Sequence, residues 1–367
     1  MSAALSPPSR RRLLGAALAF PAASAFGLAP RSEGDRETLR ALLSRNHDRS
    51  PTFGGGLSNH LSMSLFAMSS LGGHANRLQA VSAAAWSRLE PFPRGGPPVS
   101  AADWRQHLGD ARALPGLRAH FAAAVAAEGI EPVLRRTLPY LLPSFSAAAF
   151  HPAIRTGYGV RFGDAGEVAD GLAYWSSAAH PLAPLPPPSG DAADPRALLG
   201  RVRASALARV HLPDGNIDQQ LRAVAAGPGF AEATAAWRPR VDAASLLAAA
   251  AVRLYGAALV TGGDDFIALH GVTGTHAFRM LAPYLGDQEL AARYLWQALV
   301  AAYVAVGAPD LAAAPAATGA PAWDSLVERA TASVDAHDLK LTDVAREEGT
   351  RYGDPLYRKV AALRLKI

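Results

Sequence analysis

Apolar residues recur at intervals of three and four along nearly the whole chain after residue 25, and this spacing restricts the fold more than any other feature. It is the period of an α-helix with one buried face. The stretch after 58–59 has apolar side chains at Leu61, Leu65, Met68 and Leu71. Alternating β-branched residues are scarce, and 214–216 (Asp-Gly-Asn) is expected to be a loop. We therefore predict an all-α fold, a single domain of helical hairpins.

Turn-forming residues divide this pattern into helices and loops. Proline-rich stretches at 91–99 and 181–196 are expected to be extended loops, and an Ala/Pro/Gly stretch at 307–322 leads into one last long helix. Other helices are predicted at 35–44, after a cap at Ser58-Asn59, and at 101–107, 117–127 and 131–142. No Gly-rich phosphate loop follows a predicted strand, so a fold that binds a flavin or a nicotinamide is not expected.

The first 25 residues have the features of a twin-arginine signal peptide. Ser9-Arg10-Arg11-Arg12 precedes a short apolar run ending at Phe20, and Ala23-Ser24-Ala25 offers a small-x-small cleavage site. We expect residues 1–25 to be removed and residues 26–367 to be exported, already folded, by the twin-arginine translocation machinery. The destination would be the periplasm or the medium. A disordered basic tail is the alternative interpretation.

Composition excludes several kinds of partner and site. The chain has 36 basic and 31 acidic residues, and without Arg10, Arg11 and Arg12 the balance is 33 against 31, a net charge of +2. That balance is too small for a nucleic-acid footprint. The absence of cysteine excludes disulfides, cysteine nucleophiles and zinc–thiolate sites. The apolar run near 243–260 is interrupted by Arg253 and Tyr255, so no membrane anchor is expected.

Four of the eleven histidines stand at the ends or on the inner faces of predicted helices. His60 falls in the first turn after 58–59, and His151 is followed by Pro152 at a helix start. His270 lies next to Gly271 and near Gly274, which cost helix stability and suggest that another backbone or a ligand approaches closely. For a single buried histidine, the ordinary interpretation is a hydrogen-bonded core residue.

The fourth histidine lies in the predicted last long helix. Its apolar stripe has 3-4-3-4-3 spacing and contains Val327, Ala330, Val334, His337, Leu341 and Val344. Lys340 is one turn beyond His337 on the same side, although only three of the 36 basic residues are lysines. Lysine can act as a neutral base or nucleophile, or be carbamylated by CO2 into a metal-binding carboxylate.

Several imidazoles with an oxygen ligand suit iron, ahead of zinc, copper or nickel. We therefore predict that the helices pack around a buried metal site.

Four short motifs in this order resemble the questin oxidase-like family, and together they span most of the chain after the signal segment. They are Ser58-Asn59-His60-Leu61-Ser62-Met63 running to Leu71-Gly72, His151-Pro152-Ala153-Ile154 with Gly157-Tyr158 and Gly171-Leu172-Ala173-Tyr174-Trp175, Leu269-His270-Gly271-Val272-Thr273, and Asp335-Ala336-His337-Asp338-Leu339-Lys340. The resemblance implies a helical fold and a mononuclear non-haem iron. It also implies that the metal ligands are His60, His151, His270, His337 and carbamylated Lys340.

The family's fungal members oxidise polyketide anthraquinones by Baeyer–Villiger-like oxygen insertion or oxidative ring cleavage. The resemblance therefore implies an O2-dependent oxygenase that acts on an aromatic or quinone-like substrate, with NADPH as a possible external reductant. The signal peptide departs from the fungal pattern, so the natural substrate need not be a polyketide intermediate. Two rivals stay open: a metal-dependent hydrolase using the same ligands, and a non-enzymatic helical ligand-binding protein.

Other side chains are candidates for catalysis or for the substrate pocket. His276, which follows His270 by six residues and faces roughly the other way, is a competing ligand or acid/base, and Tyr158 is the second catalytic candidate. The residues expected to line the substrate pocket are His47, Tyr174, Trp175 and Phe266.

Overall fold

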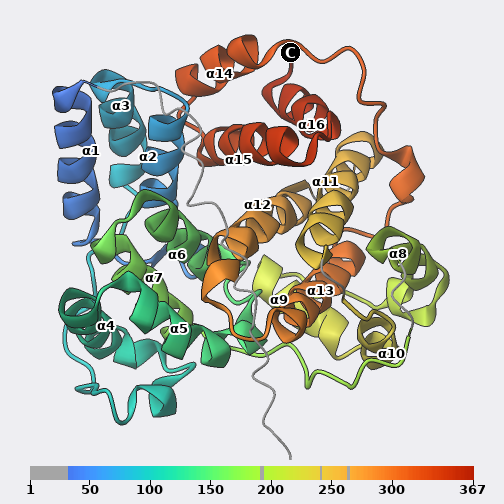
Figure 1. Ribbon diagram of the computed structural model, residues 1–367, viewed down its shortest axis with the longest axis horizontal. Coiled ribbons are helices and arrows are strands. Elements are labelled where there is room, and N and C mark those ends of the chain that lie inside the picture. The colour runs from blue at the N-terminus through green and yellow to red at the C-terminus, as the bar shows by residue number, and fades with distance from the viewer. Residues whose placement is uncertain (1–31, 191–193, 240–241, 263–264) are drawn as a thin grey trace, which may run out of the picture.

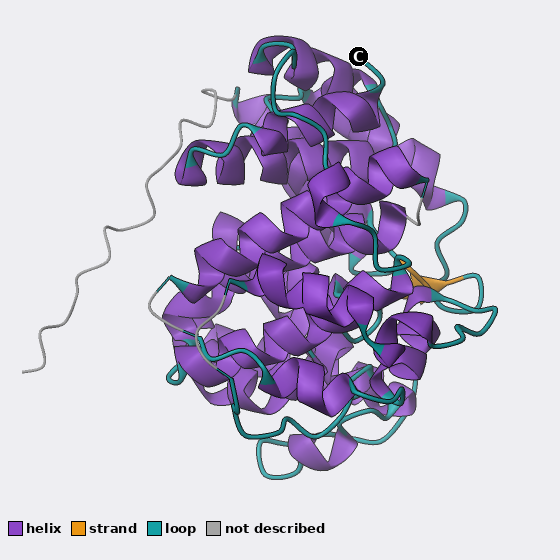
Figure 2. Cartoon of the chain, turned by 90° about the vertical axis from the view of Figure 1, so that its right-hand side faces the viewer, coloured by secondary structure: helices purple, strands orange, loops and turns teal. Residues whose placement is uncertain are grey.

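The computed structural model describes residues 32–190, 194–239, 242–262 and 265–367. The predicted signal peptide at 1–25 lies outside the described residues. Helices account for 68% of the chain and strands for 2%, which confirms the prediction of an all-α fold. One continuous hydrophobic core joins the helices, so the described residues form a single domain (Figures 1 and 2).

The described residues form sixteen α-helices and one small β-hairpin. The first helices are α1 (Glu33–Asn46), α2 (Leu61–Ser70), α3 (Ala75–Trp86), α4 (Leu114–Glu128), α5 (Ile130–Leu141), α6 (His151–Phe162), α7 (Ala165–Ser177) and α8 (Pro195–Ala204). The others are α9 (Ile217–Ala225), α10 (Phe230–Ala235), α11 (Ala243–Thr261), α12 (Asp265–Leu281), α13 (Gln288–Ala305), α14 (Trp323–Ala332), α15 (Ala336–Tyr352) and α16 (Leu356–Leu365). The hairpin pairs β1 (Thr52–Phe53) with β2 (Leu57–Ser58) in antiparallel register.

Most of the predicted helices and loops are present. The helices expected at 35–44, 117–127 and 131–142 correspond to α1, α4 and α5. The N-cap of α2 is His60 rather than Ser58 or Asn59, although Asn59 Oδ1 accepts the Leu61 N–H at 2.9 Å. The prediction at 101–107 was wrong, since only a short 3₁₀ turn forms there, at Trp104–His107. That segment is too short for the packing that stabilises most helices.

Helices α6 and α12 cross the centre of the molecule (Figure 1) and pack against each other. Glycines allow this close approach, because a Cβ on Gly157 of α6 would lie 3.1 Å from the Cα of Ala277 in α12. On its other side α6 packs against α7, where a Cβ on Gly171 would lie 2.5 Å from Thr156 Oγ1. Helix α15 packs against α2, α12 and α16, so α2, α6, α12 and α15 meet around a common centre.

The predicted last long helix is in fact two helices, α14 and α15, separated at 333–335. Asp335 starts α15 as its N-cap and accepts the backbone N–H of His337 at 2.7 Å, while the Ser333 hydroxyl accepts the N–H of Asp335 at 3.0 Å. Such local side-chain hydrogen bonds compete with a continuous helix. Val334, expected in the buried stripe, is instead 47% exposed at the break.

Helix α11 is the one helix in the described residues that is long and apolar enough to cross a membrane. We expected Arg253 and Tyr255 to interrupt the apolar run, but by length and composition the helix still qualifies as a candidate membrane span. Within the fold 61% of its apolar window is buried, and it packs against α12, α13 and α16. A core helix of a globular domain has the same composition.

Candidate metal centre

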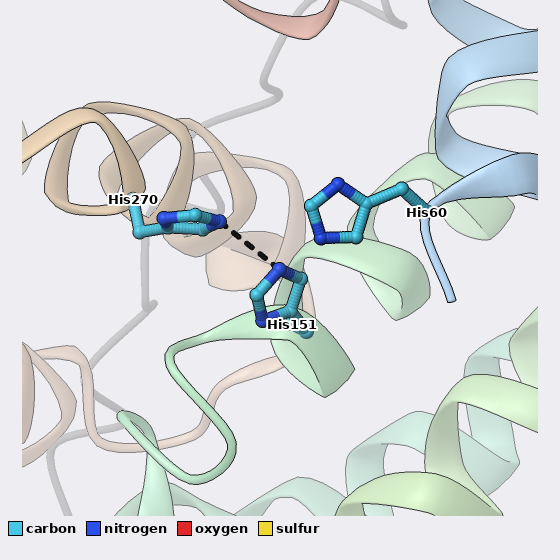
Figure 3. Close-up of side chains that lie close together, drawn as sticks. All are labelled: His60, His151 and His270. Atoms are coloured by element: carbon cyan, nitrogen blue, oxygen red, sulfur yellow. Dashed lines mark hydrogen bonds between the residues drawn. The ribbon is translucent and has the colours of Figure 1, made fainter. Parts of the chain in front are cut away.

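The four predicted histidines converge from four different helices. His60 directly precedes α2, His151 is the first residue of α6, His270 lies within α12, and His337 is in the first turn of α15. Ring centroids are 4.4 Å apart for His151–His270, 4.5 Å for His60–His151 and 4.8 Å for His60–His337. Figure 3 shows the first three rings turned toward a common point. Residues more than 200 positions apart thus form one cluster.

Local structure fixes where each ring lies. Asn59 is buried and donates through Nδ2 to Asn46 Oδ1 (3.0 Å) and to the Ser50 carbonyl (3.1 Å), so the backbone that carries His60 is anchored to α1. His337 lies where Asp335 starts α15, and its ring packs edge-on against Phe266 at 4.9 Å between centroids. The break between α14 and α15 is therefore part of how the site is built.

Backbone carbonyls determine the tautomers of two of the histidines. His151 Nδ1 donates to the Ala148 carbonyl and His270 Nδ1 to the Phe266 carbonyl, each at 2.6 Å. The proton of each neutral ring is therefore on Nδ1, and each Nε2 has a lone pair. The two Nε2 atoms face each other at 3.0 Å (Figure 3). Two lone pairs in contact require a cation, either a proton or a metal ion.

Burial disfavours the proton. It lowers the pKa of His60, His151 and His270 well below the usual histidine value, and the charge of Lys340 and the neighbouring imidazoles lower it further. The pKa of His337 is also lowered, mainly by burial, although Asp335 acts in the opposite direction. Neutral imidazoles with free Nε2 atoms are the form that binds metals.

The contact distance also fits a metal. With metal–nitrogen bonds of about 2.1 Å, two nitrogens at a right angle are about 3.0 Å apart, and two at a tetrahedral angle about 3.4 Å. The observed 3.0 Å between the His151 and His270 Nε2 atoms is a separation that two nitrogen ligands of one metal ion can have.

Lys340 lies behind the histidines and is completely buried. Its Nζ has no hydrogen-bond partner among the described residues. Burial lowers the pKa of Lys340 to about 7, so a large fraction of the amine is uncharged near neutral pH. A buried amine without a partner is costly. A neutral amine can react with CO2, and the resulting carbamate would bring an oxygen ligand to four nitrogens.

A cavity of about 600 Å³ lies beside the histidines, which form part of its wall. This volume is within the range of about 300–1,000 Å³ that is usual for small-molecule sites. Most of the other wall residues are apolar, among them Phe53, Leu57, Leu61, Val81, Leu89, Ile217, Phe266 and Val334. Three of these apolar wall residues, Leu57, Phe266 and Val334, are 58%, 41% and 47% exposed. The arrangement suits an apolar ring system next to a metal.

Of the four residues expected to line the substrate pocket, Phe266 is in the cavity wall, and His47, Tyr174 and Trp175 are not. Tyr174 lies behind the wall, with its hydroxyl 2.9 Å from Ser58 Oγ. Trp175 is buried and donates through Nε1 to the Ser144 carbonyl. Tyr174 and Trp175 belong to α7, which packs on the far side of α6 and directs them into the core. His47 follows α1 and contacts Asp170 at 2.8 Å.

The two catalytic candidates, Tyr158 and His276, also lie outside the cavity wall, in a separate buried network. The Tyr158 hydroxyl donates to Asp343 Oδ2 at 3.0 Å, and His276 Nδ1 contacts Glu348 Oε1. The other members of the network are Arg161, Arg279 and Glu347. It joins α6, α12 and α15. Tyr158 and His276 lie about two helical turns beyond His151 and His270, roughly 10 Å along the axes of α6 and α12. The hydrogen bonds and ion pairs of this network hold the three helices together.

Two other clusters could offer ligands to a metal, but both already contain cations. His47 lies 2.8 Å from Asp170, whose carboxylate also pairs with Arg155 and Arg118. In the Tyr158–His276 network, Arg279 pairs with Glu348. A divalent ion would have to displace guanidinium groups there. The trio of His60, His151 and His270 is the histidine-rich cluster of the described residues without such a partner.

Two contributors to the site were not predicted. One is the turn 148–150, whose carbonyl orients His151, and the other is Asp335, which caps α15 and lines the cavity. The Ser-x-Asp sequence before His337 is a helix-start signal that could have revealed Asp335. The turn at 148–150 could not be predicted, because Ala and Phe rarely adopt the positive φ angles that it requires.

A family model described as questin oxidase-like matches residues 57–344, well over half of the chain. The matched range includes all four histidines and Lys340. No curated protein matches the chain.

Proposed function

We propose that this chain, which belongs to the questin oxidase-like family, is an O2-dependent non-haem iron oxygenase that acts on an aromatic or quinone-like substrate. The observation that carries the proposal is the contact between the Nε2 lone pairs of His151 and His270, 3.0 Å apart beside an apolar cavity. The family name supports an oxidase activity. The cavity supports a largely apolar organic substrate.

The residues that would hold iron(II) are His60, His151, His270, His337 and Lys340 after carbamylation. In that reaction the neutral amine attacks CO2, an N–C bond forms, and the amine loses one proton, which leaves a carbamate. When bound, iron supplies the one-electron chemistry that lets O2 react with a closed-shell organic molecule. The carbamate would add negative charge to a site whose other four ligands are neutral.

The chain's own residues would orient the substrate and exclude water. Phe266 stacks edge-on against His337 and is exposed to the cavity, so it is placed to hold a flat ring near the ligands. The apolar wall around it disfavours water. A reaction that inserts one oxygen atom requires two further electrons, which an external donor such as NADPH would supply. Assays with and without NADPH therefore separate a monooxygenase from a dioxygenase.

The first test is metal analysis of protein purified without chelators, combined with O2 consumption in the presence of a hydroxylated anthraquinone. We expect about one iron per chain and substrate-dependent O2 uptake. His151→Ala should lose metal because it removes a proposed ligand. Lys340→Arg should also lose metal, because arginine cannot form a carbamate. Arg94→Ala changes an exposed arginine outside the cavity wall and should have no effect.

Three outcomes would contradict the proposal. Absence of stoichiometric metal would favour the helical ligand-binding protein, and full metal content in Lys340→Arg would exclude the carbamate. Stoichiometric zinc without O2 uptake would favour the metal-dependent hydrolase. His276, the candidate base of that hydrolase, contacts Glu348 and lies outside the cavity wall.

A further inference from the structure

The turn that precedes His151 is strained. Ala148, Ala149 and Phe150 follow one another with φ of 45°, 58° and 67°. This left-handed region is unfavourable for every residue that has a Cβ. Three such residues in succession persist only where the surrounding structure holds them.

Within its own segment, the Phe150 N–H donates to the Ser146 carbonyl at 3.2 Å and the His151 N–H donates to the Ala148 carbonyl at 3.3 Å. Two further contacts to the turn come from other helices. The Ala148 N–H donates to Asp218 Oδ1 at 3.2 Å, and Asp218 belongs to the first turn of α9, where Arg222 pairs with it at 3.2 Å. At the other end the Phe150 ring is fully buried against α12. A Cβ on Gly274 would lie 2.8 Å from Phe150 Cδ1, so only glycine leaves room for the ring. This contact explains why α12 tolerates a glycine near His270.

The turn controls a metal ligand directly. The carbonyl of Ala148 accepts the Nδ1–H of His151 at 2.6 Å, and the N–H of the same residue is held by Asp218. A single residue thus transmits the position of Asp218 to the His151 ring. If Ala148 relaxed to an ordinary conformation, its carbonyl would turn away from Nδ1, and the Nε2 lone pair would lose its fixed direction.

We propose that Asp218 is a positioning residue for the metal ligand His151, acting through the left-handed turn at 148–150. The proposal rests on the proposed function, since it assumes that His151 binds a metal. Asp218, Ala148 and Ala149 also line the cavity, so the turn and its Asp218 contact lie next to the space for the organic substrate. Partners that orient metal-binding histidines typically contribute about 10–100-fold to metal affinity.

The test measures Co(II) and Fe(II) affinity of the full-length protein by anaerobic titration, together with the visible spectrum of the Co(II) form. Asp218→Ala should bind both metals about 10–100-fold more weakly, with a changed Co(II) spectrum. Asp218→Asn keeps an acceptor oxygen and should restore affinity and spectrum. Asp287→Ala is the matched control, because Asp287 also accepts a backbone N–H, from Leu290 at 2.8 Å, but at the start of α13.

A second measurement needs no metal. Nitrogen NMR of histidine-labelled protein reports which ring nitrogen has the proton, and we expect the Nδ1–H signature of His151 to become mixed in Asp218→Ala. Adding Ala148→Gly should partly restore it, since glycine adopts positive φ without strain.

Wild-type affinity, spectrum and tautomer in Asp218→Ala would overturn the inference and leave the metal site intact. A wild-type protein that binds neither metal would instead contradict the proposed function.

Discussion

At the scale of single residues, burial lowers the pKa of Lys340 and of the four histidines, and so favours their uncharged forms. Lys340 and the four histidines could be identified from the sequence because lysine is rare in this chain and the histidines stand at helix starts or on inner faces. What the sequence could not predict is which neighbouring side chains face them. His47 and Tyr174 have equally plausible positions, yet Asp170 and Ser58 hold them in other contacts. Such choices depend on tertiary packing, which local spacing does not contain.

Carbamylation of Lys340 predicts a dependence on CO2. Protein refolded or loaded with iron in CO2-depleted buffer should take up less metal than protein loaded with bicarbonate. Lys340→Ala should lose metal and recover part of it when a short carboxylic acid such as acetate is added, because the acid can occupy the space of the missing carbamate. Metal analysis after gel filtration measures both effects. Equal metal uptake with and without bicarbonate would contradict the carbamate.

A second prediction concerns Glu348. Burial alone would raise its pKa, but the hydrogen bond to His276 and the charges of His276 and Arg279 lower it to about 2. A carboxyl with a lowered pKa stabilises the fold above its unfolded pKa of about 4.5, and this stability is lost as the pH falls toward 2. The effect corresponds to about 3 kcal/mol.

Glu348→Gln should therefore unfold more easily than wild type at pH 7, by up to about 3 kcal/mol, with a difference that shrinks below pH 4.5. Urea titrations at several pH values measure this. Glu37→Gln is the control, because Glu37 is exposed and forms no ion pair within the described residues. A stability difference that does not change with pH would show that Glu348 acts through packing rather than through charge.

At the scale of helices, periodicity predicted most elements because each buried face repeats every three or four residues. It failed where side chains interrupt the backbone pattern: Ser333 and Asp335 end one helix and start the next without disturbing the apolar spacing. The break matters for the site, because it places His337 in a first turn, next to the cavity. A pattern of apolar residues alone cannot distinguish one long helix from two that continue the same stripe.

Close helix packing makes a paired prediction about glycines. Gly171→Ala should destabilise the protein by about 1–3 kcal/mol, because the new Cβ would lie 2.5 Å from Thr156 Oγ1 and 2.9 Å from its backbone nitrogen. Gly200→Ala, in α8 with no atom within 4 Å of the new Cβ, should stabilise it by about 0.5–1 kcal/mol. Thermal unfolding compares the two. Equal effects would mean that helix propensity, not the contact between α6 and α7, determines the result.

At the scale of the whole molecule, the predicted export route would restrict when a metal can be loaded. The ligands come from four helices spread over residues 60–340, so the site exists only once the chain has folded. A twin-arginine route would carry the protein folded, and iron could then bind in the cytoplasm before export. The predicted signal is Arg10-Arg11, followed by Arg12 and the apolar run from Leu13.

Replacing Arg10 and Arg11 by lysine keeps the charge but removes the paired arginines that the translocation machinery reads. We expect this double variant to stay in the cytoplasm with residues 1–25 attached, and to contain as much iron as the exported wild type. Arg12→Lys should be exported and processed normally. Cell fractionation, mass spectrometry of the N-terminus and metal analysis of each fraction test these outcomes. Export of the double variant at the wild-type level would exclude the twin-arginine route. Iron found only in the exported fraction would show that the metal is loaded after translocation.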